Sequence, residues 1–403
     1  MNSLKSRKIA ILAPSAPPLG GGGVSSAHFN LYKILKRIGY DIYLITFGDE
    51  GDPTDEEEIV RFGSSPRLRW LINLGIYFYL KSKGSKKLAY QVSDILTLVP
   101  GALKVNRYLR VLKPDVVILP DHGAPGLFIS KRNCKLFLVS HHNPARFVGN
   151  PLVGDFCPID ARIAVNLEQR VLRKIDGVIC PSEYMRKSFQ STFQFTESVA
   201  VIPNLVDAAF VASVPGADLR KQLDLDDAAP LIFIPSAGSR PKGARFVYEI
   251  VRRLTAAYGR PLGFYLSGAI ENELQMELRH APANARLFAP GHVNYGENLA
   301  YMKTCSFGVS PTLIENFSMA ILEANYCRLP MVVFDVGGNR EIVSPGENGF
   351  LAPYLDVEAL IAAAVSLLDQ DRLVALRART LAAVEKKFQY PVILEQLVRF
   401  LHQ

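Results

Sequence analysis

Short apolar segments alternate with segments of helical periodicity along this whole sequence. Residues 8–14, 41–47 and 116–119 are apolar and short enough to be buried strands, and helix-period segments separate them. The same alternation resumes at residues 231–235 and continues beyond residues 331–335. This order predicts doubly wound parallel sheets with helices on both faces, an α/β fold. Because 403 residues exceed one ordinary core, the length predicts two to three domains.

Two carboxylates stand eight residues apart in the most informative unit of this alternation. Residues 305–310 predict a buried strand, Glu315 lies in the loop after it, and Glu323 lies about a turn into the next helix. Ser318 or Asn316 can cap that helix. The carboxyl edge of a parallel sheet is where α/β folds hold ligands. Since carboxylates suit vicinal diols and a helix start favours an anion, this unit fits a nucleotide sugar.

The same region carries a resemblance to a known family. The Glu-x7-Glu run, Leu329-Pro330 and Gly337-Gly338-x-x-Glu341-Ile342-Val343 resemble family 4 of the retaining GT-B glycosyltransferases. The resemblance covers most of the chain and is densest from residue 305 to 353. It implies two Rossmann-like domains facing across a cleft. It also implies transfer of a hexose from a nucleotide-diphosphate sugar, with no metal or other cofactor.

The resemblance implies a role for each residue of this loop. Glu315 would contact the donor sugar and Glu323 the ribose hydroxyls. The intervening backbone amides would face the sugar and the phosphates, and they belong to Asn316, Phe317, Ser318 and Met319. Asn316 and Ser318 occupy positions where the family usually has glycine. The alternative for the two glutamates is that both are solvated charges at a helix end.

Two glycine-bearing loops are predicted to hold the diphosphate. Gly22 and Gly23 precede the helix-period segment of residues 24–37, where glycine lets the backbone approach a ligand and the helix start favours phosphate. Arg240 and Lys242 follow a later strand in a Gly/Ser loop and supply fixed positive charge. The resemblance implies the same roles for all four. The alternatives are a turn without a ligand and two solvated cations.

Polar residues also follow two strands of the first half. Asp121 and His122 follow one strand, and His141 and His142 follow the next. A histidine there could bind a metal, act as an acid or base, or hydrogen-bond a sugar hydroxyl. Adjacent histidines on a strand point to opposite faces and rarely share one metal. The resemblance implies that His142 contacts the donor hexose, with His141 as the fallback. A hydrogen-bonded core histidine is the alternative.

The segment of residues 67–87 has an unusual composition. Its centre, residues 70–80, is mostly apolar and aromatic and is bracketed by cations, which is typical of a helix on a membrane surface or of an acceptor site. The alternative is an amphipathic core helix with solvated ends. The bracketing cations are Arg61, Arg67, Arg69, Lys81, Lys83, Lys86 and Lys87.

The domain boundary is predicted near residue 204. Residues 202–207 resemble the family's crossing between domains, and a polar stretch separates them from the strand at residue 231. We therefore assign residues 1–203 to an acceptor-side domain and residues 204–388 to a nucleotide-sugar domain. In the family the last helix returns to the first domain, so residues 389–403 would complete it.

Composition bounds the partners and the compartment. The net charge of +8 suits an anionic donor or anionic lipid, and the sequence has neither zinc-finger spacing nor a basic–aromatic repeat for nucleic acid. Five scattered cysteines predict reduced core residues of a cytosolic protein, and no signal peptide or membrane-spanning run is apparent. We expect a cytoplasmic protein that uses a UDP- or GDP-sugar and a glycan or lipid-linked acceptor, with possible contact at the inner membrane leaflet.

The expected activity is that of a retaining hexosyltransferase in polysaccharide, lipopolysaccharide or glycolipid synthesis. His142, Glu315, Arg240 and Lys242 are the candidate catalytic residues, and a front-face route is favoured because no enzymic nucleophile is evident. We expect Arg240, Lys242 and backbone amides to stabilise the leaving diphosphate without a metal. Two alternatives remain open, a 2-epimerase-type enzyme without a sugar acceptor and a non-catalytic GT-B binding protein. A nicotinamide dehydrogenase is disfavoured because Ser25 and Ser26 stand where the dinucleotide fingerprint needs glycine.

Overall fold

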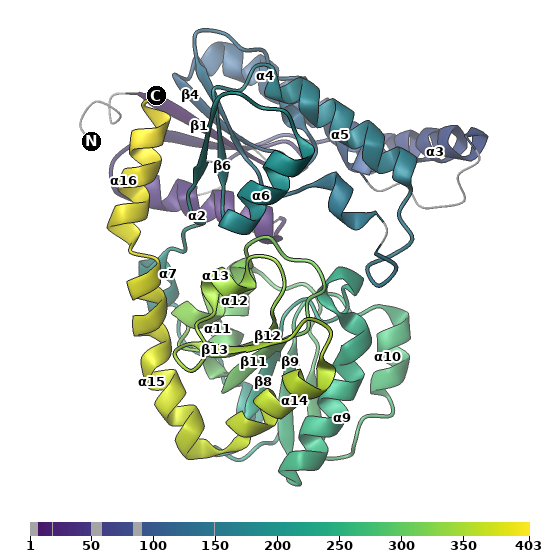
Figure 1. The fold of residues 1–403 in the computed structure, drawn as a ribbon, viewed down its shortest axis with the longest axis vertical. Helices are drawn as coiled ribbons and strands as arrows, with labels where there is room; N and C mark the ends of the chain where they lie inside the picture. The colour runs from purple at the N-terminus through teal and green to yellow at the C-terminus, as the bar shows by residue number, and fades with distance from the viewer. Residues whose placement is uncertain (1–6, 18, 50–58, 84–90, 149) are drawn as a thin grey trace. The chain divides into compact units, whose positions relative to one another are not determined.

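The computed structural model describes residues 7–17, 19–49, 59–83, 91–148 and 150–403. The chain forms two compact units, one made of Met1–Asp207 with Tyr390–Gln403 and the other of Ala208–Gln389. The sequence analysis put these divisions after residues 203 and 388. Each unit has its own parallel sheet, and Figure 1 shows helices beside each of them.

The described part of the first unit is built on a seven-stranded parallel sheet of order β3-β2-β1-β4-β5-β6-β7. Its central strands are buried apolar runs because helices cover both faces. The strands are β1 (Lys8–Ala13), β2 (Asp41–Thr46), β3 (Val60–Arg61), β4 (Val116–Pro120), β5 (Lys135–Val139), β6 (Gly177–Cys180) and β7 (Ser198–Val201).

Local signals in the sequence account for the ends of several helices in this unit. Gly22 has φ 109° at the start of α2, and Gly39 follows its end with φ 85°. The Ser182 hydroxyl accepts a hydrogen bond from the Met185 amide at 3.0 Å and caps α6. The helices are α2 (Gly23–Arg37), α3 (Pro66–Ser82), α4 (Gln91–Leu112), α5 (Pro158–Leu172), α6 (Glu183–Thr192) and α16 (Tyr390–Leu401), with the short turns η1 (Pro125–Leu127) and η2 (Pro144–Phe147).

The last helix, α16, packs on the sheet of the first unit (Figure 1). The ring of Phe400 lies 5.5 Å from that of Phe137 on β5. A Cβ atom at Gly177 on β6 would lie 2.8 Å from the Phe400 ring, so the absence of a side chain at Gly177 lets α16 approach.

The described part of the second unit has a six-stranded parallel sheet of order β10-β9-β8-β11-β12-β13. All residues of the four central strands are buried, whereas the edge strand β10 is only half-buried. The strands are β8 (Leu231–Ile234), β9 (Leu262–Leu266), β10 (Ala285–Phe288), β11 (Phe307–Ser310), β12 (Met331–Phe334) and β13 (Gly349–Ala352).

Helices again alternate with these strands. The longer ones present apolar faces to the sheet, as α9 does with Ile250, Val251 and Leu254. The helices are α7 (Ala208–Ser213), α8 (Leu219–Gln222), α9 (Val247–Tyr258), α10 (Asn272–Leu278), α11 (Tyr295–Thr304), α12 (Met319–Tyr326), α13 (Asn339–Ile342), α14 (Val357–Val365) and α15 (Gln370–Lys387), with the short turns η3 (Arg240–Lys242), η4 (Ala244–Phe246) and η5 (Ser366–Leu368).

Both sheets reverse their strand order at one point, between β1 and β4 in the first unit and between β8 and β11 in the second. Ligands of open α/β sheets bind outside the carboxyl ends of the strands at such a switch point. The loops that leave β1, β4, β8 and β11 are therefore the places to look for a site. These loops carry most of the side chains that the sequence analysis selected.

The structure corrects two predictions for residues 67–87. The core-helix alternative is wrong, because only Ile76 and Leu80 of α3 are buried. Arg61 is not a cation flanking this segment on the surface, since it is 4 % exposed and lies 2.7 Å from Asp49. Lys86 and Lys87 lie outside the described residues. None of the helices in the described ranges is long and apolar enough to cross a membrane.

Candidate functional site

The switch point of the second unit brings together Lys242 and Glu315. Lys242 ends η3 in the loop after β8, and Glu315 lies in the loop after β11. The Lys242 Nζ atom lies 2.6 Å from the Glu315 Oε2 atom, and Glu315 is 9 % exposed. Glu315 also accepts a hydrogen bond from the Asn316 amide at 3.0 Å. The predicted sugar contact and the predicted phosphate contact are thus direct neighbours.

Two glycines allow these loops to approach one another. Gly243 has φ 85°, and a Cβ atom there would lie 2.0 Å from the carbonyl oxygen of Pro311. Gly337 has φ 59°, and a Cβ atom there would lie 1.8 Å from the carbonyl oxygen of Glu315. Any other residue at either position would push the loop that carries Glu315 away. These contacts give a physical reason for Gly-Gly after β12 and for Lys-Gly after β8.

Glu323 lies on α12, which begins after Ser318. The Ser318 hydroxyl accepts a hydrogen bond from the Ile321 amide at 3.4 Å, so Ser318 and not Asn316 is the N-cap. Glu323 is 4 % exposed and accepts a hydrogen bond from the Tyr295 hydroxyl, while its Oε1 atom has no partner among the residues the structure describes. Burial raises the pKa of Glu323 to about 8.

The burial of Glu315 and Glu323 excludes the interpretation that they are solvated charges at a helix end. Glu315 is tied to a cation, and Glu323 is held by a tyrosine. Of the four residues predicted to supply amides, Phe317, Ser318 and Met319 are also buried. This loop is therefore a fixed structure with polar groups at its inner side, as a binding loop requires.

Arg240 is placed differently from Lys242. Its guanidinium lies 3.5 Å from Glu273 and 3.8 Å from Glu271, and its side chain is 61 % exposed. The structure therefore shows Arg240 as a surface cation paired with two acids near α10, and not as a part of the Lys242–Glu315 pair. Its predicted contact with a diphosphate requires it to leave these partners.

Gly22 and Gly23 begin α2 at the switch point of the first unit. A Cβ atom at either position would meet no other atom within 4 Å, so the space beside them is open. The φ of 109° at Gly22 favours glycine there, whereas Gly23 has no such requirement. The loop has the open helix start that the sequence predicted for an anion site.

His142 lies in a partly buried polar cluster after β5. Its Nε2 atom lies 2.6 Å from the Gln91 Oε1 atom, and its amide donates a hydrogen bond to Asp121 at 2.7 Å. The rings of His122 and Phe147 lie 5.8 and 5.3 Å away. Burial holds the pKa of His142 well below its usual value, so the ring is neutral at pH 7. The Gln91 side-chain amide is thus the hydrogen-bond partner of this ring nitrogen.

His141 points toward different neighbours. Its Nε2 atom lies 2.9 Å from the Asn204 Oδ1 atom, and its ring lies 5.4 Å from that of His28 on α2. Burial lowers the pKa of His141 to about 4. The two histidines thus have separate surroundings, as expected for adjacent residues at the end of a strand.

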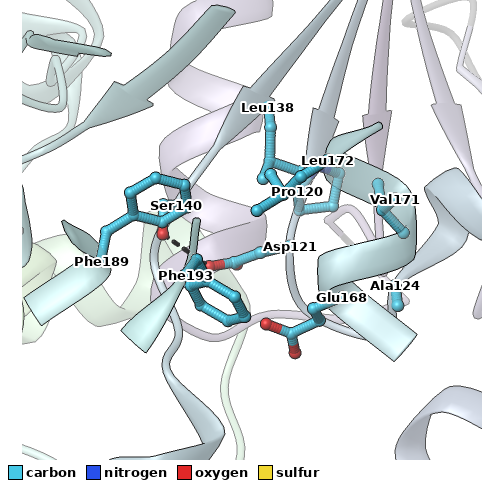
Figure 2. Close-up of a pocket in the computed structure, with 10 residues that line it drawn as sticks. All are labelled: Pro120, Asp121, Ala124, Leu138, Ser140, Glu168, Val171, Leu172, Phe189 and Phe193. Atoms are coloured by element: carbon cyan, nitrogen blue, oxygen red, sulfur yellow. Dashed lines mark hydrogen bonds between the residues drawn. The ribbon is translucent and has the colours of Figure 1, made fainter. Parts of the chain in front are cut away.

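Asp121, which follows β4, is hydrogen-bonded to the residues that follow β5. It accepts hydrogen bonds from the Ser140 hydroxyl at 3.1 Å and from the His142 amide at 2.7 Å. Figure 2 shows it in an apolar pocket with Glu168 of α5, walled by Phe189 and Phe193. Burial raises the pKa of Asp121 to about 7 and raises that of Glu168 well above its usual value.

Sequence reasoning missed two residues, one in each unit, that contact predicted site residues. Gln91 is the first residue of α4, and its side chain contacts His142. The backbone amide of Gln91 donates a hydrogen bond to the Asp160 carboxylate at 2.9 Å. Tyr295, the first residue of α11, contacts Glu323. Neither stands in a motif or at a strand end. The nearest sequence signal for Tyr295 is the capping box formed by Asn294 and Glu297, which predicts that a helix starts at Tyr295.

Comparisons with known proteins cover most of the chain. The family model described as "Glycosyltransferase Family 4" matches residues 21–210, and the one described as "Glycosyl transferases group 1" matches residues 229–370. The second match contains Lys242, Glu315 and Glu323. The first contains Gly22, Gly23 and His142.

Two curated relatives illustrate the similarity. The chain is 24% identical, over 58% of its length and 64% of the relative, to the GDP-mannose-dependent monoacylated alpha-(1-6)-phosphatidylinositol monomannoside mannosyltransferase of Corynebacterium glutamicum. It is 24% identical, over 91% of its length and 90% of the relative, to the MMP alpha-(1->4)-mannosyltransferase of Mycolicibacterium hassiacum. The chain spans just under two thirds of the length of the first curated relatives it matches.

The fold is also shared with solved structures. The crystal structure of Anabaena HepE in complex with UDP-glucose is similar, with a TM-score of 0.68 and 20% identity over 98% of this chain and 99% of that chain. With two Rossmann-like parallel sheets, the fold of the chain is of the GT-B class.

Proposed function

This chain belongs to the group 1 glycosyltransferases of family 4, and we propose that it moves a hexose from a nucleotide-diphosphate sugar to a hydroxyl of a glycan or lipid-linked acceptor. Cell-surface polysaccharide, lipopolysaccharide or glycolipid synthesis is the proposed setting. The observation that carries this proposal is the pair of Lys242 and Glu315, 2.6 Å apart at a switch point of a doubly wound sheet.

Lys242 is the proposed stabiliser of the leaving diphosphate. Negative charge builds on the diphosphate as the bond to the sugar breaks, and a fixed cation beside it lowers the barrier. Lys242 is partly exposed, so its ammonium can reach a ligand, and Glu315 holds it in place meanwhile. The amides at the start of α2, from Gly22 and Gly23, and the guanidinium of Arg240 are proposed to share this role.

Glu315 and His142 are proposed to contact the donor hexose. A carboxylate that is paired with Lys242 is a weak nucleophile, which favours a front-face route with retention over a covalent intermediate. His142 is neutral and offers a hydrogen bond to a sugar hydroxyl without adding charge. The amides of residues 316–319 are proposed to bind the sugar and the phosphates.

Glu323 is the proposed ribose ligand. A ribose diol donates two hydrogen bonds, and the Oε1 atom of Glu323 lacks a partner in the described part of the chain. Because this atom is shielded from solvent, a bound ribose must displace the side chains that cover it. Ionised Glu323 is the better acceptor, so donor binding is coupled to release of its proton.

GDP- and UDP-sugars are the proposed donors. The Corynebacterium relative is described as GDP-mannose-dependent, and Anabaena HepE was crystallised with UDP-glucose. We rank GDP-mannose first because both curated relatives described above are mannosyltransferases. We also propose that the reaction takes place in the cytoplasm and needs no metal, since Lys242 supplies the positive charge.

The test is a thermal-shift screen with GDP-, UDP-, ADP- and dTDP-sugars, followed by turnover of the best donor with and without EDTA. The proposal expects one nucleotide class to raise Tm and turnover to survive chelation. No shift with any nucleotide sugar would contradict it. Donor consumed to a rearranged sugar without any acceptor would instead indicate the 2-epimerase-type alternative, which no observation on the site favours.

A further inference from the structure

Helix α3 exposes a continuous apolar face on the first unit. Its members are large, and each is at least a third exposed, which is unusual for side chains of this kind. They are Trp70 at 63%, Leu71 at 57%, Leu74 at 37%, Tyr77 at 56% and Phe78 at 59%. Figure 1 shows α3 at the outer margin of the unit. We refer to these five residues as the α3 face.

The α3 face has the geometry of a single stripe. Its members are three, four, seven and eight positions apart, so at 100° per residue they span an arc of roughly 120°. Ile76 and Leu80 lie on the opposite side, where they are buried and α3 packs on α4. Leu68 and Tyr79 lie away from the α3 face and are also exposed, at 40% and 51%, so Ile76 and Leu80 are the buried contacts that anchor the helix.

Cations close both ends of the stripe. Arg67 and Lys81 fall within the same arc, one turn before Leu71 and one turn after Tyr77, and both are exposed. The Lys81 ammonium lies 5.7 Å from the centre of the Tyr77 ring. No acidic residue occurs in α3. The α3 face is thus an aromatic and aliphatic strip, about 20 Å long, with positive charge at each end.

We propose that the α3 face docks in the plane of an anionic lipid surface, with Trp70, Leu71, Leu74, Tyr77 and Phe78 among the upper acyl chains and Arg67 and Lys81 against the headgroups. Trp and Tyr rings prefer this interface because one end is apolar and the other polar. Lys and Arg at the borders gain from anionic headgroups, and the net charge of +8 adds to the attraction. A helix of 17 residues with this face lies on the bilayer and does not cross it.

The biological role of this lipid binding rests on the proposed function, since an enzyme with a lipid-linked acceptor gains from being held at the lipid surface. The surface itself can be tested without any sugar substrate. Failure of lipid binding would leave the donor screen untouched, and failure of the donor screen would leave lipid binding untouched.

The chain offers a built-in probe, because Trp70 is its only tryptophan. The experiment adds vesicles of phosphatidylcholine, alone or with about 30% phosphatidylglycerol, to the full chain and records emission and co-sedimentation. We expect a blue shift of Trp70 emission and co-sedimentation with the anionic vesicles only. Quenching by brominated acyl chains should then report that the ring has entered the bilayer.

Variants separate the apolar and the charged contributions. Leu71→Ser/Tyr77→Ser/Phe78→Ser keeps Trp70 as the probe and should weaken binding at least tenfold, and Arg67→Glu/Lys81→Glu should abolish the preference for anionic lipid. The matched control is Val111→Ser/Val374→Ser, which removes two exposed apolar side chains from α4 and α15 and should bind as the wild type does. Circular dichroism and urea midpoints verify that each variant folds.

Three results would overturn the proposal. The first is an unshifted Trp70 emission with every vesicle, and the second is unchanged binding by the triple Ser variant. The third is self-association in sedimentation velocity that the triple variant abolishes, without lipid binding by the wild type. That third result would assign the α3 face to a second copy of the chain.

Discussion

Lys242 and Glu315, 73 positions apart in the sequence, form an ion pair with 2.6 Å between Nζ and Oε2. The pair joins the loops after β8 and β11, the two strands that flank the switch point. Each partner neutralises the other before a donor arrives. Under the proposed function, a bound diphosphate would share the Lys242 charge at little cost in reorganisation, because the ammonium is already held by Glu315.

Lys242→Ala should reduce kcat by about 100-fold or more, since removal of one preorganised donor to a developing anion costs about that much. Its effect on folding should be smaller, about 1–3 kcal/mol, because Lys242 is a third exposed but its loss removes the cation from the buried Glu315 carboxylate. The measurements are turnover with saturating donor and urea unfolding. Lys221→Ala, at an exposed lysine of α8, is the control. Normal kcat together with a normal urea midpoint for Lys242→Ala would refute the role.

Gly337→Ala should destabilise the second unit, because the new Cβ atom would lie 1.8 Å from the Glu315 carbonyl oxygen. Gly259→Ala is a matched control, since Gly259 also has positive φ, 69°, but has open space around it. The control should cost about 1 kcal/mol of unfolding free energy, from backbone strain alone. Gly337→Ala should cost at least about 2 kcal/mol more and should weaken donor binding. Equal urea midpoints for the two variants would contradict this.

Glu323 should make stability depend on pH. Burial raises its pKa in the folded chain from 4.5 to about 8, so between these values the unfolded chain loses a proton that the folded chain keeps. The contribution of Glu323 to the unfolding free energy should therefore fall by up to about 1.4 kcal/mol per pH unit across that window and be constant outside it. Urea unfolding of the wild type and Glu323→Gln from pH 5 to 9 tests this. The variant should lose this slope, and identical slopes would argue against it.

Burial should keep His142 neutral, and a negative charge at position 91 should oppose this effect. Replacing the amide by a carboxylate in Gln91→Glu places an anion 2.6 Å from Nε2, which favours the charged ring and should raise the pKa of His142. NMR titration of the histidine ring protons measures this, with the His142→Gln variant to assign the signal. The pKa of the wild-type ring should lie well below its usual value of 6.5, because burial disfavours the charged form. A wild-type His142 that titrates at 6.5 or above would contradict the buried geometry.

Several parts of the fold could be predicted because their signals are local. A strand covered on both faces has to be apolar throughout, so β8, β11 and β12 were visible as short apolar runs. Ser182 and Ser318 cap the helices that follow them through hydrogen bonds that span three residues. The strand β3 was missed, because its two residues, Val60 and Arg61, make no apolar run.

Residue spacing and the family motifs determined the two sheets and the loops at their carboxyl edges. They also selected Lys242 and Glu315 in two of those loops and Glu323 in the helix that follows, because period and motif are properties of neighbours in the chain. Tertiary structure alone decided which of these charges meet. In the folded chain Lys242 pairs with Glu315, whereas Arg240 pairs with Glu271 and Glu273. It also buried Arg61 against Asp49 and left Trp70 in solvent. The physical reason is that burial and ion pairing depend on which distant segments pack together, and charged or aromatic side chains fit either environment until that packing is made.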